Sequence, residues 1–422
     1  MTATDIHRTI EAVWRIESPR LIAGLARIVR DVGTAEELAQ DALVTALEQW
    51  PASGVPHNPG AWLMTTAKRR AIDQLRRHAL HRRKEGELTR EIEEQLEQSV
   101  GDMDAMLDDA IGDDLLSLVF TACHPVLSTD ARVALTLRLI GGLTTPEIAR
   151  AFLVPEATLA QRIVRAKRTL SEANVPFEVP RGEELAVRLA SVLEVVYLIF
   201  NEGYAATAGD DWMRPALCEE AMRLGRVLAG LAPAEPEVHG LVALMEIQAS
   251  RTAARTGPNG EPILLTEQNR ARWDPLLIRR GLAALQRAEA LGGAEGPYAL
   301  QAAIAACHAR AAHVEDTDWP RIAALYDRLA QRMPSPVVAL NRAVAHAMAF
   351  GPESGLAQVD ALRDEPLLRH YHLLPGVRGD LLQRLGRHAE AREEFLRAAE
   401  LARNARERTL MLQRAALLQD LP

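Results

Sequence analysis

Residues 58–77, NPGAWLMTTAKRRAIDQLRR, form the stretch that decides the fold. Pro59 and Gly60 indicate a turn, and after them apolar residues recur at helical spacing. The pattern predicts a helix that packs through a stripe made of Ala61, Met64, Ala67, Ala71, Ile72 and Leu75. At about 100° per residue, the other side carries an aromatic ring and several charges. Its members are Trp62, Thr66, Arg69, Asp73, Arg76 and Arg77, with Arg70 at the edge.

An aromatic ring among guanidinium groups is suited to backbone phosphates and to a base taken out of its stack. The alternative is a surface helix with a solvated basic face, because charge runs are usually no more than that. The order of the other motifs along the chain decides between these two interpretations.

Composition predicts an all-α, multi-domain protein. The 422 residues are enough for about three domains, and only 4% of them are aromatic. Cys123, Cys218 and Cys307 lie far apart, which indicates reduced thiols and a cytoplasmic protein. The amino terminus has no apolar core of signal-peptide length, and no stretch approaches the roughly 18 apolar residues of a membrane span. We therefore expect no membrane association.

The net charge of −8 is segregated along the chain. Residues 68–84 hold eight Lys or Arg against one acid, whereas residues 85–114 hold twelve acids against one base. The basic block fits a nucleic-acid contact, and the acidic block reads as a solvated, semi-ordered linker.

Upstream, residues 8–50 read as two or three helices. Thr34 is predicted as an N-cap, with Glu37 three residues later completing a capping box. The helix that follows is expected to end near Trp50, and the proline-rich residues 51–59 read as a loop.

Residues 143–170 read as a helix-turn-helix. Thr144 and Glu147 form a capping box, residues 153–155 make the turn, and Leu159, Ile163, Ala166 and Leu170 bury the second helix. The side chains opposite that stripe suit DNA, because Gln pairs with adenine, Arg pairs with guanine and cations bind phosphates. They are Thr158, Gln161, Arg165 and Arg168, with Arg162 at the flank. Arg162, Lys167 and Arg168 are the candidates for phosphate contacts. Where many such motifs have glycine in the turn this chain has Leu153, so we expect a turn without positive φ.

After the loop at residues 176–184 the chain reads as helical pairs. Tyr326 and Phe395 lie 69 residues apart, close to two tetratricopeptide periods of about 34 residues. Small and aromatic packing residues recur at Gly379, Gly386, Ala391, Phe395 and Ala398. The alternative is an ordinary helical array, and both interpretations predict an α-solenoid.

Several polar or aromatic residues in this half stand in aliphatic surroundings. They either line a pocket or form buried hydrogen bonds that fix helix register. The candidates are Asn201, Glu202, Tyr204, Arg272, Trp273 and Asp274.

These motifs together resemble a known family. The residues Pro59-Gly60-Ala61-Trp62-Leu63 and the basic run after them resemble the helix with which bacterial extracytoplasmic-function sigma factors read and melt the −10 promoter element. Residues 35–43 are similar to the segment that grips the polymerase clamp helices, and residues 143–170 resemble the domain that binds the −35 element. The whole chain looks like the group with a long, tetratricopeptide-like carboxy-terminal extension, which is thought to regulate activity.

The resemblance implies roles for individual residues. Core polymerase binding falls on Glu37, Leu38, Gln40 and Asp41. A flipped base of the −10 element would be received by Val55, His57 and Asn58, and that element would be melted by Trp62, Thr66, Arg69, Arg70, Asp73, Arg76 and Arg77. The implied domains are region 2 at residues 1–78, an acidic linker at 79–112, region 4 at 113–174, a helical extension at 185–290 and tetratricopeptide-like repeats at 297–420. In sigma factors such a linker threads basic channels of the polymerase.

The expected partners are core RNA polymerase, duplex and melted promoter DNA, and a protein or peptide regulator at the solenoid. Because neither a Gly-rich phosphate loop nor a Gly-x-Ser-x-Gly elbow occurs, we expect no enzyme activity and no cofactor. Cys123 with His124, and His370 with His372, lack further ligands at useful spacing, so metal binding is not expected. The alternative function is a one-component helix-turn-helix regulator with a protein-binding scaffold.

Overall fold

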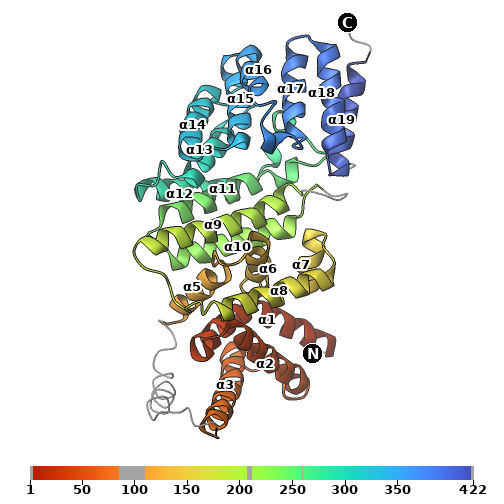
Figure 1. The fold of residues 1–422 in the computed structure, drawn as a ribbon. Coiled ribbons are helices and arrows are strands. Elements are labelled where there is room, and N and C mark those ends of the chain that lie inside the picture. Colours follow the sequence, from red (N-terminus) through yellow and green to blue (C-terminus); the bar gives the residue numbers. More distant parts are fainter. Residues whose placement is uncertain (1–2, 85–109, 207–211, 259, 420–422) are drawn as a thin grey trace. The chain divides into compact units, whose positions relative to one another are not determined.

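The computed structural model describes residues 3–84, 110–206, 212–258 and 260–419 (Figure 1). Within those ranges the secondary structure is helical and contains no strand, so the prediction of an all-α protein is confirmed. No described helix is both long enough and apolar enough to span a lipid bilayer. The chain divides into two compact units, Met1–Val196 and Tyr197–Pro422.

The first unit holds seven described helices and the start of an eighth. They are α1 (Ala3–Val29), α2 (Val32–Ser53), α3 (Pro59–Lys84), α5 (Ala110–Ala122), α6 (Thr129–Leu139), α7 (Thr145–Phe152), α8 (Glu156–Glu172) and the first part of α9 (Glu183–Tyr204). Helices α1, α2 and α3 pack on one another, and α1 also packs against α5 while α2 contacts α8. The predicted acidic linker falls largely on residues 85–109, outside the described residues, and the predicted domain boundaries remain predictions.

Two expectations about α2 are wrong. Its N-cap is Asp31, whose carboxylate accepts hydrogen bonds from the Thr34 amide (2.7 Å) and hydroxyl (2.9 Å). Thr34 therefore donates to the cap instead of forming it, because Asp31 reaches the free amides of the first turn one residue before the helix begins. The helix also continues through Pro51 to Ser53 and ends at Gly54, where φ is +84°.

The predicted buried stripe of α3 is confirmed at Ala67 and Ala71 but is offset at its start, where Leu63 is buried instead of Ala61. Leu63, Ala67 and Ala71 are buried at spacings of four residues, whereas Ala61 is exposed. Met64, Ile72 and Leu75 are half-buried at the sides of the stripe. The offset arises because α3 packs against both α1 and α2, which turns Leu63 into the core.

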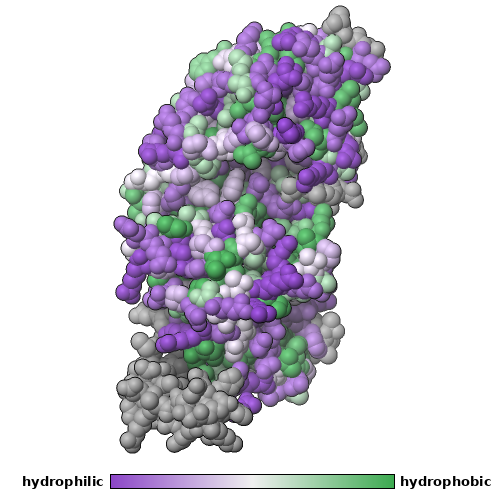
Figure 2. All heavy atoms as spheres, in the orientation of Figure 1, coloured by the Kyte–Doolittle hydropathy of each residue, from purple (hydrophilic) through white to green (hydrophobic). Residues whose placement is uncertain are grey.

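In the second unit, from α10 to α19, each helix packs against the next. After the end of α9 come α10 (Pro215–Leu231), α11 (Pro236–Ala249), α12 (Pro275–Ala290), α13 (Pro297–Arg310), α14 (Trp319–Arg332), α15 (Pro336–Phe350), α16 (Pro352–Asp360), α17 (Leu373–Arg384), α18 (His388–Leu401) and α19 (Ala405–Leu417). The predicted solenoid packing is visible where α17 crosses α18, because a Cβ on Gly379 would lie 2.9 Å from the ring of Phe395. Figure 2 shows hydrophilic residues over most of the visible face, with hydrophobic residues in small groups between them.

Candidate nucleic-acid interface

The N-terminus of α3 fixes the position of Trp62. The Asn58 side-chain oxygen accepts a hydrogen bond from the Ala61 amide at 3.1 Å, so Asn58 caps the helix. One turn into the helix, the half-buried Trp62 ring meets the buried ring of Trp50 edge-on, with centroids 5.3 Å apart. Such edge-to-face pairs stabilise the arrangement by roughly 0.5–1.5 kcal/mol beyond burial. Trp62 is therefore held in one orientation at the protein surface.

The cationic side of α3 is exposed beside that ring. Arg69, Arg76 and Arg77 are exposed, as is Asp73, whose backbone carbonyl accepts a hydrogen bond from Arg77 Nε at 3.2 Å. Arg69 makes no hydrogen bond or ion pair within the described part of the chain. These arginines carry charge that a phosphate backbone can neutralise.

Two members of the predicted set on α3 are engaged within the protein. Arg70 forms an ion pair with Asp41 at 3.2 Å and donates to the Thr45 hydroxyl at 2.8 Å, which ties α3 to α2. The Thr66 hydroxyl donates to the backbone carbonyl of Trp62 at 2.9 Å. These contacts stabilise the helix pair that carries the arginines.

The predicted capping box of α7 is confirmed. Glu147 accepts hydrogen bonds from the Thr144 amide and hydroxyl, both at 2.7 Å, and the Thr144 hydroxyl accepts one from the Glu147 amide. Burial works to raise the pKa of Glu147, but these hydrogen bonds, with the charges of Arg15 and Arg150, outweigh it and lower that pKa. These hydrogen bonds fix the first turn of α7, where the helix-turn-helix begins.

The expectation about the turn is wrong. Leu153 lies in the left-handed region, with φ +51° and ψ +41°. Its conformation lets the Val154 amide donate to the carbonyl of Ala149 at 3.0 Å, which closes a Schellman-type helix end. The turn therefore keeps the conformation that favours glycine, and a leucine with 56% exposure occupies it.

Four of the predicted −35 residues line one hollow of about 350 Å³ beside α8. Its lining includes Thr158, Gln161, Arg162 and Arg165. Arg162 is held by Asp130 at 3.3 Å, whereas the Gln161 and Arg165 side chains are exposed and make no hydrogen bond to other described residues. Exposed amide and guanidinium groups on one helix face are the groups that read base edges in a major groove.

The other two predicted −35 residues are engaged elsewhere. Arg168 pairs with Glu172 at 2.6 Å on the same helix. Lys167 lies on the opposite side of α8 from Arg165, two residues away at about 100° each, and pairs with Glu36 of α2. The structure thus separates Lys167 from the hollow that holds Gln161.

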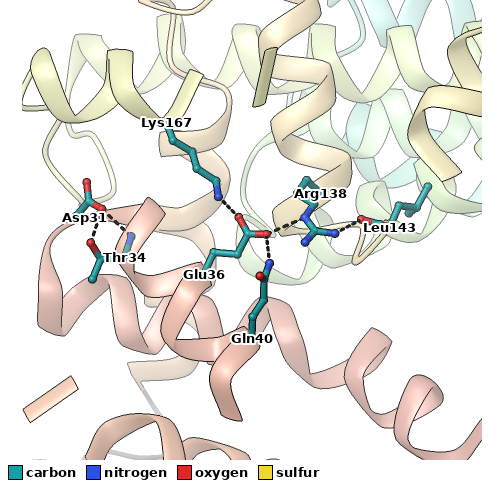
Figure 3. Close-up of polar contacts among 7 residues, drawn as sticks. All are labelled: Asp31, Thr34, Glu36, Gln40, Arg138, Leu143 and Lys167. Atoms are coloured by element: carbon teal, nitrogen blue, oxygen red, sulfur yellow. Dashed lines mark hydrogen bonds and ion pairs between the residues drawn. The ribbon is translucent and has the colours of Figure 1, made fainter. Parts of the chain in front are cut away.

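Glu36 is the centre of a buried polar cluster that the sequence analysis missed (Figure 3). Its side chain is 4% exposed. One carboxylate oxygen accepts hydrogen bonds from Arg138 Nε at 2.7 Å and from Gln40 Nε2 at 2.8 Å, and the other pairs with Lys167 Nζ. The available signal was Glu36 itself, a carboxylate beside Ala35 and Ala39 in the buried stripe of α2.

The predicted polymerase-binding residues differ in exposure. Glu37 and Asp41 are exposed on α2, and Asp41 also pairs with Arg70. Leu38 is only 4% exposed and belongs to the core, and Gln40 is half-buried against Glu36. The accessible part of this set is therefore Glu37 with Asp41.

In the second unit the residues that were predicted to line a pocket have different partners and do not all meet at one site. Tyr204 and Trp273 share a neighbour, because the Arg251 guanidinium lies 5.8 Å from both ring centroids. Glu202 pairs with Arg214, and Asp274 caps α12 by accepting from the Leu276 amide at 2.8 Å. The remaining two, Asn201 and Arg272, are exposed. Most of this set therefore has a structural role.

Comparison with known families adds three matches along the chain. The family model described as Sigma-70 region 2 matches residues 14–81, and the one described as Sigma-70, region 4 matches residues 117–170. Residues 188–289 match a family of unknown function (DUF6596). The first two matches cover α3 and the helix-turn-helix described above.

Relatives extend the comparison to the whole chain. An uncharacterized protein of Rhizobium meliloti (strain 1021) is 44% identical over 390 residues, which cover 92% of this chain and 91% of that protein. A probable ECF RNA polymerase sigma factor, SigI, of Mycobacterium tuberculosis is 25% identical over 186 residues, 44% of this chain and 62% of that protein. The chain belongs to the extracytoplasmic-function type of RNA polymerase sigma factors, as a member with a carboxy-terminal extension.

Proposed function

We propose that this sigma factor opens the −10 element with α3 and reads the −35 element with α8 while core RNA polymerase holds the chain. The observation that carries the proposal is the presence of two different DNA-suited faces on one chain. On α3 an oriented Trp62 lies among exposed arginines, and on α8 Gln161 and Arg165 are exposed beside one hollow. The first face suits unpaired bases and the second suits duplex DNA.

Melting by α3 requires binding energy and no chemical step. Extrusion of a base costs a few kcal/mol, and stacking of a base on an aromatic ring contributes roughly 1–3 kcal/mol. Because Trp50 already orients the Trp62 ring, little side-chain entropy is lost when a base stacks on it. Arg69, Arg76 and Arg77 supply phosphate contacts that hold the strand beside the ring.

We assign core polymerase binding to the exposed side of α2, with Glu37 and Asp41 as its charged residues. Helix α2 also carries Trp50 and contacts α3 through Arg70. A polymerase bound there would therefore place α3 at the DNA strand that it opens. This role, with promoter DNA as the other partner, implies that the protein acts in the cytoplasm.

Two binding measurements separate this proposal from a one-component repressor. The purified chain is expected to co-elute with core RNA polymerase and to bind a specific promoter mainly as part of that complex. Glu37→Ala should weaken co-elution, whereas Glu48→Ala, at another exposed position of α2, should leave it unchanged. Tight specific binding to duplex DNA without polymerase, together with failure to co-elute, would favour the repressor.

We further propose that the solenoid binds a regulator through an acidic segment. A cavity of about 260 Å³ has a charged lining of four arginines and three acids: Arg363, Arg369, Arg378 and Arg397 with Asp364, Glu365 and Glu394. Arg378 is buried and paired with Asp360 (2.7 Å) and Glu394 (2.8 Å), whereas the other three arginines are exposed. Exposed guanidinium groups around a cavity suit carboxylates.

Charge reversal at the cavity tests this proposal. Arg369→Glu with Arg397→Glu should change promoter activity in cells without changing transcription by the purified protein and polymerase. Arg321→Glu, on the exposed side of α14, is the matched control. Equal cellular activity of the cavity variant and the control would contradict a regulator at this cavity.

A further inference from the structure

We propose that Arg251 is the centre of a binding site, in the second unit, for a small organic oxyanion: a carboxylate or a phosphate monoester with an apolar body. The site shares no residue with the regulator cavity around Arg378 or with the two DNA-suited faces. The proposal is therefore independent of the proposed function. Its test measures binding to the full-length chain without polymerase or DNA.

The backbone between α11 and α12 fixes the position of Arg251. Ser250 follows the last residue of α11, and its carbonyl accepts a hydrogen bond from the Asp274 amide at 2.8 Å. This bond brings together Arg251 and Trp273, the sequence neighbours of those two residues. The Arg251 guanidinium carbon lies 5.8 Å from the centroid of the Trp273 ring and also 5.8 Å from that of Tyr204, at the end of α9. Two aromatic rings therefore flank one guanidinium group.

Arg251 belongs to a cluster of three arginines. The Arg255 guanidinium lies 3.4 Å from the centroid of the Tyr204 ring, and that of Arg270 lies 5.0 Å from the centroid of Trp273. None of the three forms an ion pair with a carboxylate of the described residues. Burial, with the charge of Arg251, lowers the pKa of Arg255 to about 10. Because arginine stays protonated in proteins and buried charges are normally paired, the cluster carries an excess of positive charge.

Two of these arginines are compensated at helix ends. Arg255 donates to the carbonyl of Tyr204, and Arg270 donates to the carbonyl of His308 at 2.5 Å. Carbonyls at the carboxyl end of a helix carry partial negative charge. Arg251 instead donates to an uncharged group, the Tyr204 hydroxyl, at 2.7 Å. Because Arg251 is half-buried while Arg255 is 6% exposed, Arg251 is both more accessible than Arg255 and the least compensated charge of the three.

Uncharged polar groups surround Arg251 on the side of α13 and α14. Burial, with the charges of Arg251 and Arg270, lowers the pKa of His308 to about 4. Burial raises the pKa of Tyr326 to about 12, against the opposing charge of Arg251. Both groups are therefore neutral near pH 7. The half-buried Tyr326 makes no hydrogen bond to another described residue through its hydroxyl, which leaves that hydroxyl available as a donor to an oxyanion.

This combination of groups fits an oxyanion that carries an apolar body. A planar guanidinium pairs bidentately with a carboxylate or with two oxygens of a phosphate. The rings of Tyr204 and Trp273 offer flat apolar surface to the rest of the ligand. A small inorganic anion would use the guanidinium but not the rings. The expected ligand is therefore an organic acid, and experiment separates its two forms.

Calorimetric titration of the full-length chain tests the site with three probes that share a phenyl ring. Benzoate or phenyl phosphate should bind saturably to one site per chain, with a Kd of about 1 mM or lower, and the stronger of the two identifies the acid group. Benzyl alcohol, which has no charge, should bind at least about tenfold more weakly, because charge-assisted hydrogen bonds are lost. Absence of binding by both acids, or equal binding by benzyl alcohol, would overturn the proposal.

Variants locate the bound probe. Arg251→Gln should weaken binding of the stronger acid at least about tenfold, and Tyr326→Phe should weaken it by a smaller factor of about 2–5. Arg279→Gln, at an exposed arginine of α12, is the matched control, and Arg369→Glu with Arg397→Glu controls for binding at the regulator cavity. Both controls should bind as the wild-type chain does. Wild-type affinity in Arg251→Gln would overturn the proposal, as would wild-type affinity in Tyr326→Phe if Arg251→Gln fails to fold.

Discussion

Trp62 has one edge against Trp50 and is only half-buried, so a single side chain belongs both to the core and to the surface. Asn58 also has a structural role, because it was predicted as a base contact and caps α3 through its side-chain oxygen. A substitution at such a residue changes the fold and the DNA contact together. Tests of DNA contacts are therefore sharper on side chains without partners among the described residues, such as Arg69 and Gln161.

Base preference at the −35 element is expected to depend on Gln161 and Arg165. Substitution of either by alanine should reduce discrimination at one base pair by roughly 1–3 kcal/mol, because a bidentate contact is lost. Arg168→Ala should instead weaken binding to all sequences alike, as expected of a phosphate contact. Selection of bound promoters from a randomised library, with polymerase present, would measure both effects. An unchanged preference in the Gln161 and Arg165 variants would contradict their assignment.

His308 should make the stability of the solenoid depend on pH. Burial, with the nearby charges of Arg251 and Arg270, lowers the pKa of His308 from 6.5 to about 4. The unfolded chain therefore takes up a proton below pH 6.5 that the folded chain does not, and the free energy of unfolding falls as the pH drops toward 4. The loss approaches roughly 3 kcal/mol and is absent above pH 7.

His308→Gln isolates this contribution. Urea unfolding at pH 7.5 and pH 5 should show a smaller loss of stability at low pH in the variant than in the wild-type chain. Any constant effect of lost packing against Trp319, whose ring centroid lies 5.2 Å away, cancels in that difference. Identical losses in the two proteins would show that His308 titrates normally in the fold.

Among the elements, α7 and α3 show what local sequence can predict. The capping box at Thr144 and Glu147 was predictable because every group in it lies within four residues. The predicted buried stripe of α3 included Ala67 and Ala71 but omitted Leu63, because two neighbouring helices decide which side is covered. Similarly, Asp31 and Thr34 are both good caps, and only the position of the first helical residue distinguishes them.

The turn of the helix-turn-helix offers a stability test. Leu153 holds a left-handed conformation that is costly for residues with a Cβ, and its side chain is largely exposed. Leu153→Gly should therefore leave the fold intact and change the free energy of unfolding by no more than about 1 kcal/mol, with stabilisation the expected sign. Thermal or urea unfolding would measure it. A loss of several kcal/mol would show that the Leu153 side chain contributes packing not visible in its exposure.

At the scale of the whole molecule, the sequence pattern predicted a long helical carboxy-terminal part, and the predicted packing residues Gly379 and Phe395 do meet between α17 and α18. The contact of Glu36 with Arg138 was beyond prediction from one sequence, since 102 residues separate them and no periodic pattern links them. The same reason explains why Lys167 was predicted to bind a phosphate, although Glu36 binds it in this structure. Contacts remote in sequence thus decide which predicted site residues are accessible.

The central claim is that one polymerase-held chain melts the −10 element with Trp62 of α3. Permanganate footprinting of a cognate promoter, with core polymerase and the wild-type chain, should reveal reactive thymines in that element. Trp62→Ala should reduce this reactivity about 5–150-fold, equivalent to roughly 1–3 kcal/mol of lost stacking, while the variant still co-elutes with polymerase. Arg69→Ala, an exposed position on the same helix, should reduce reactivity in the same direction without disturbing the Trp50 contact. Full thymine reactivity in the Trp62→Ala complex would contradict the account.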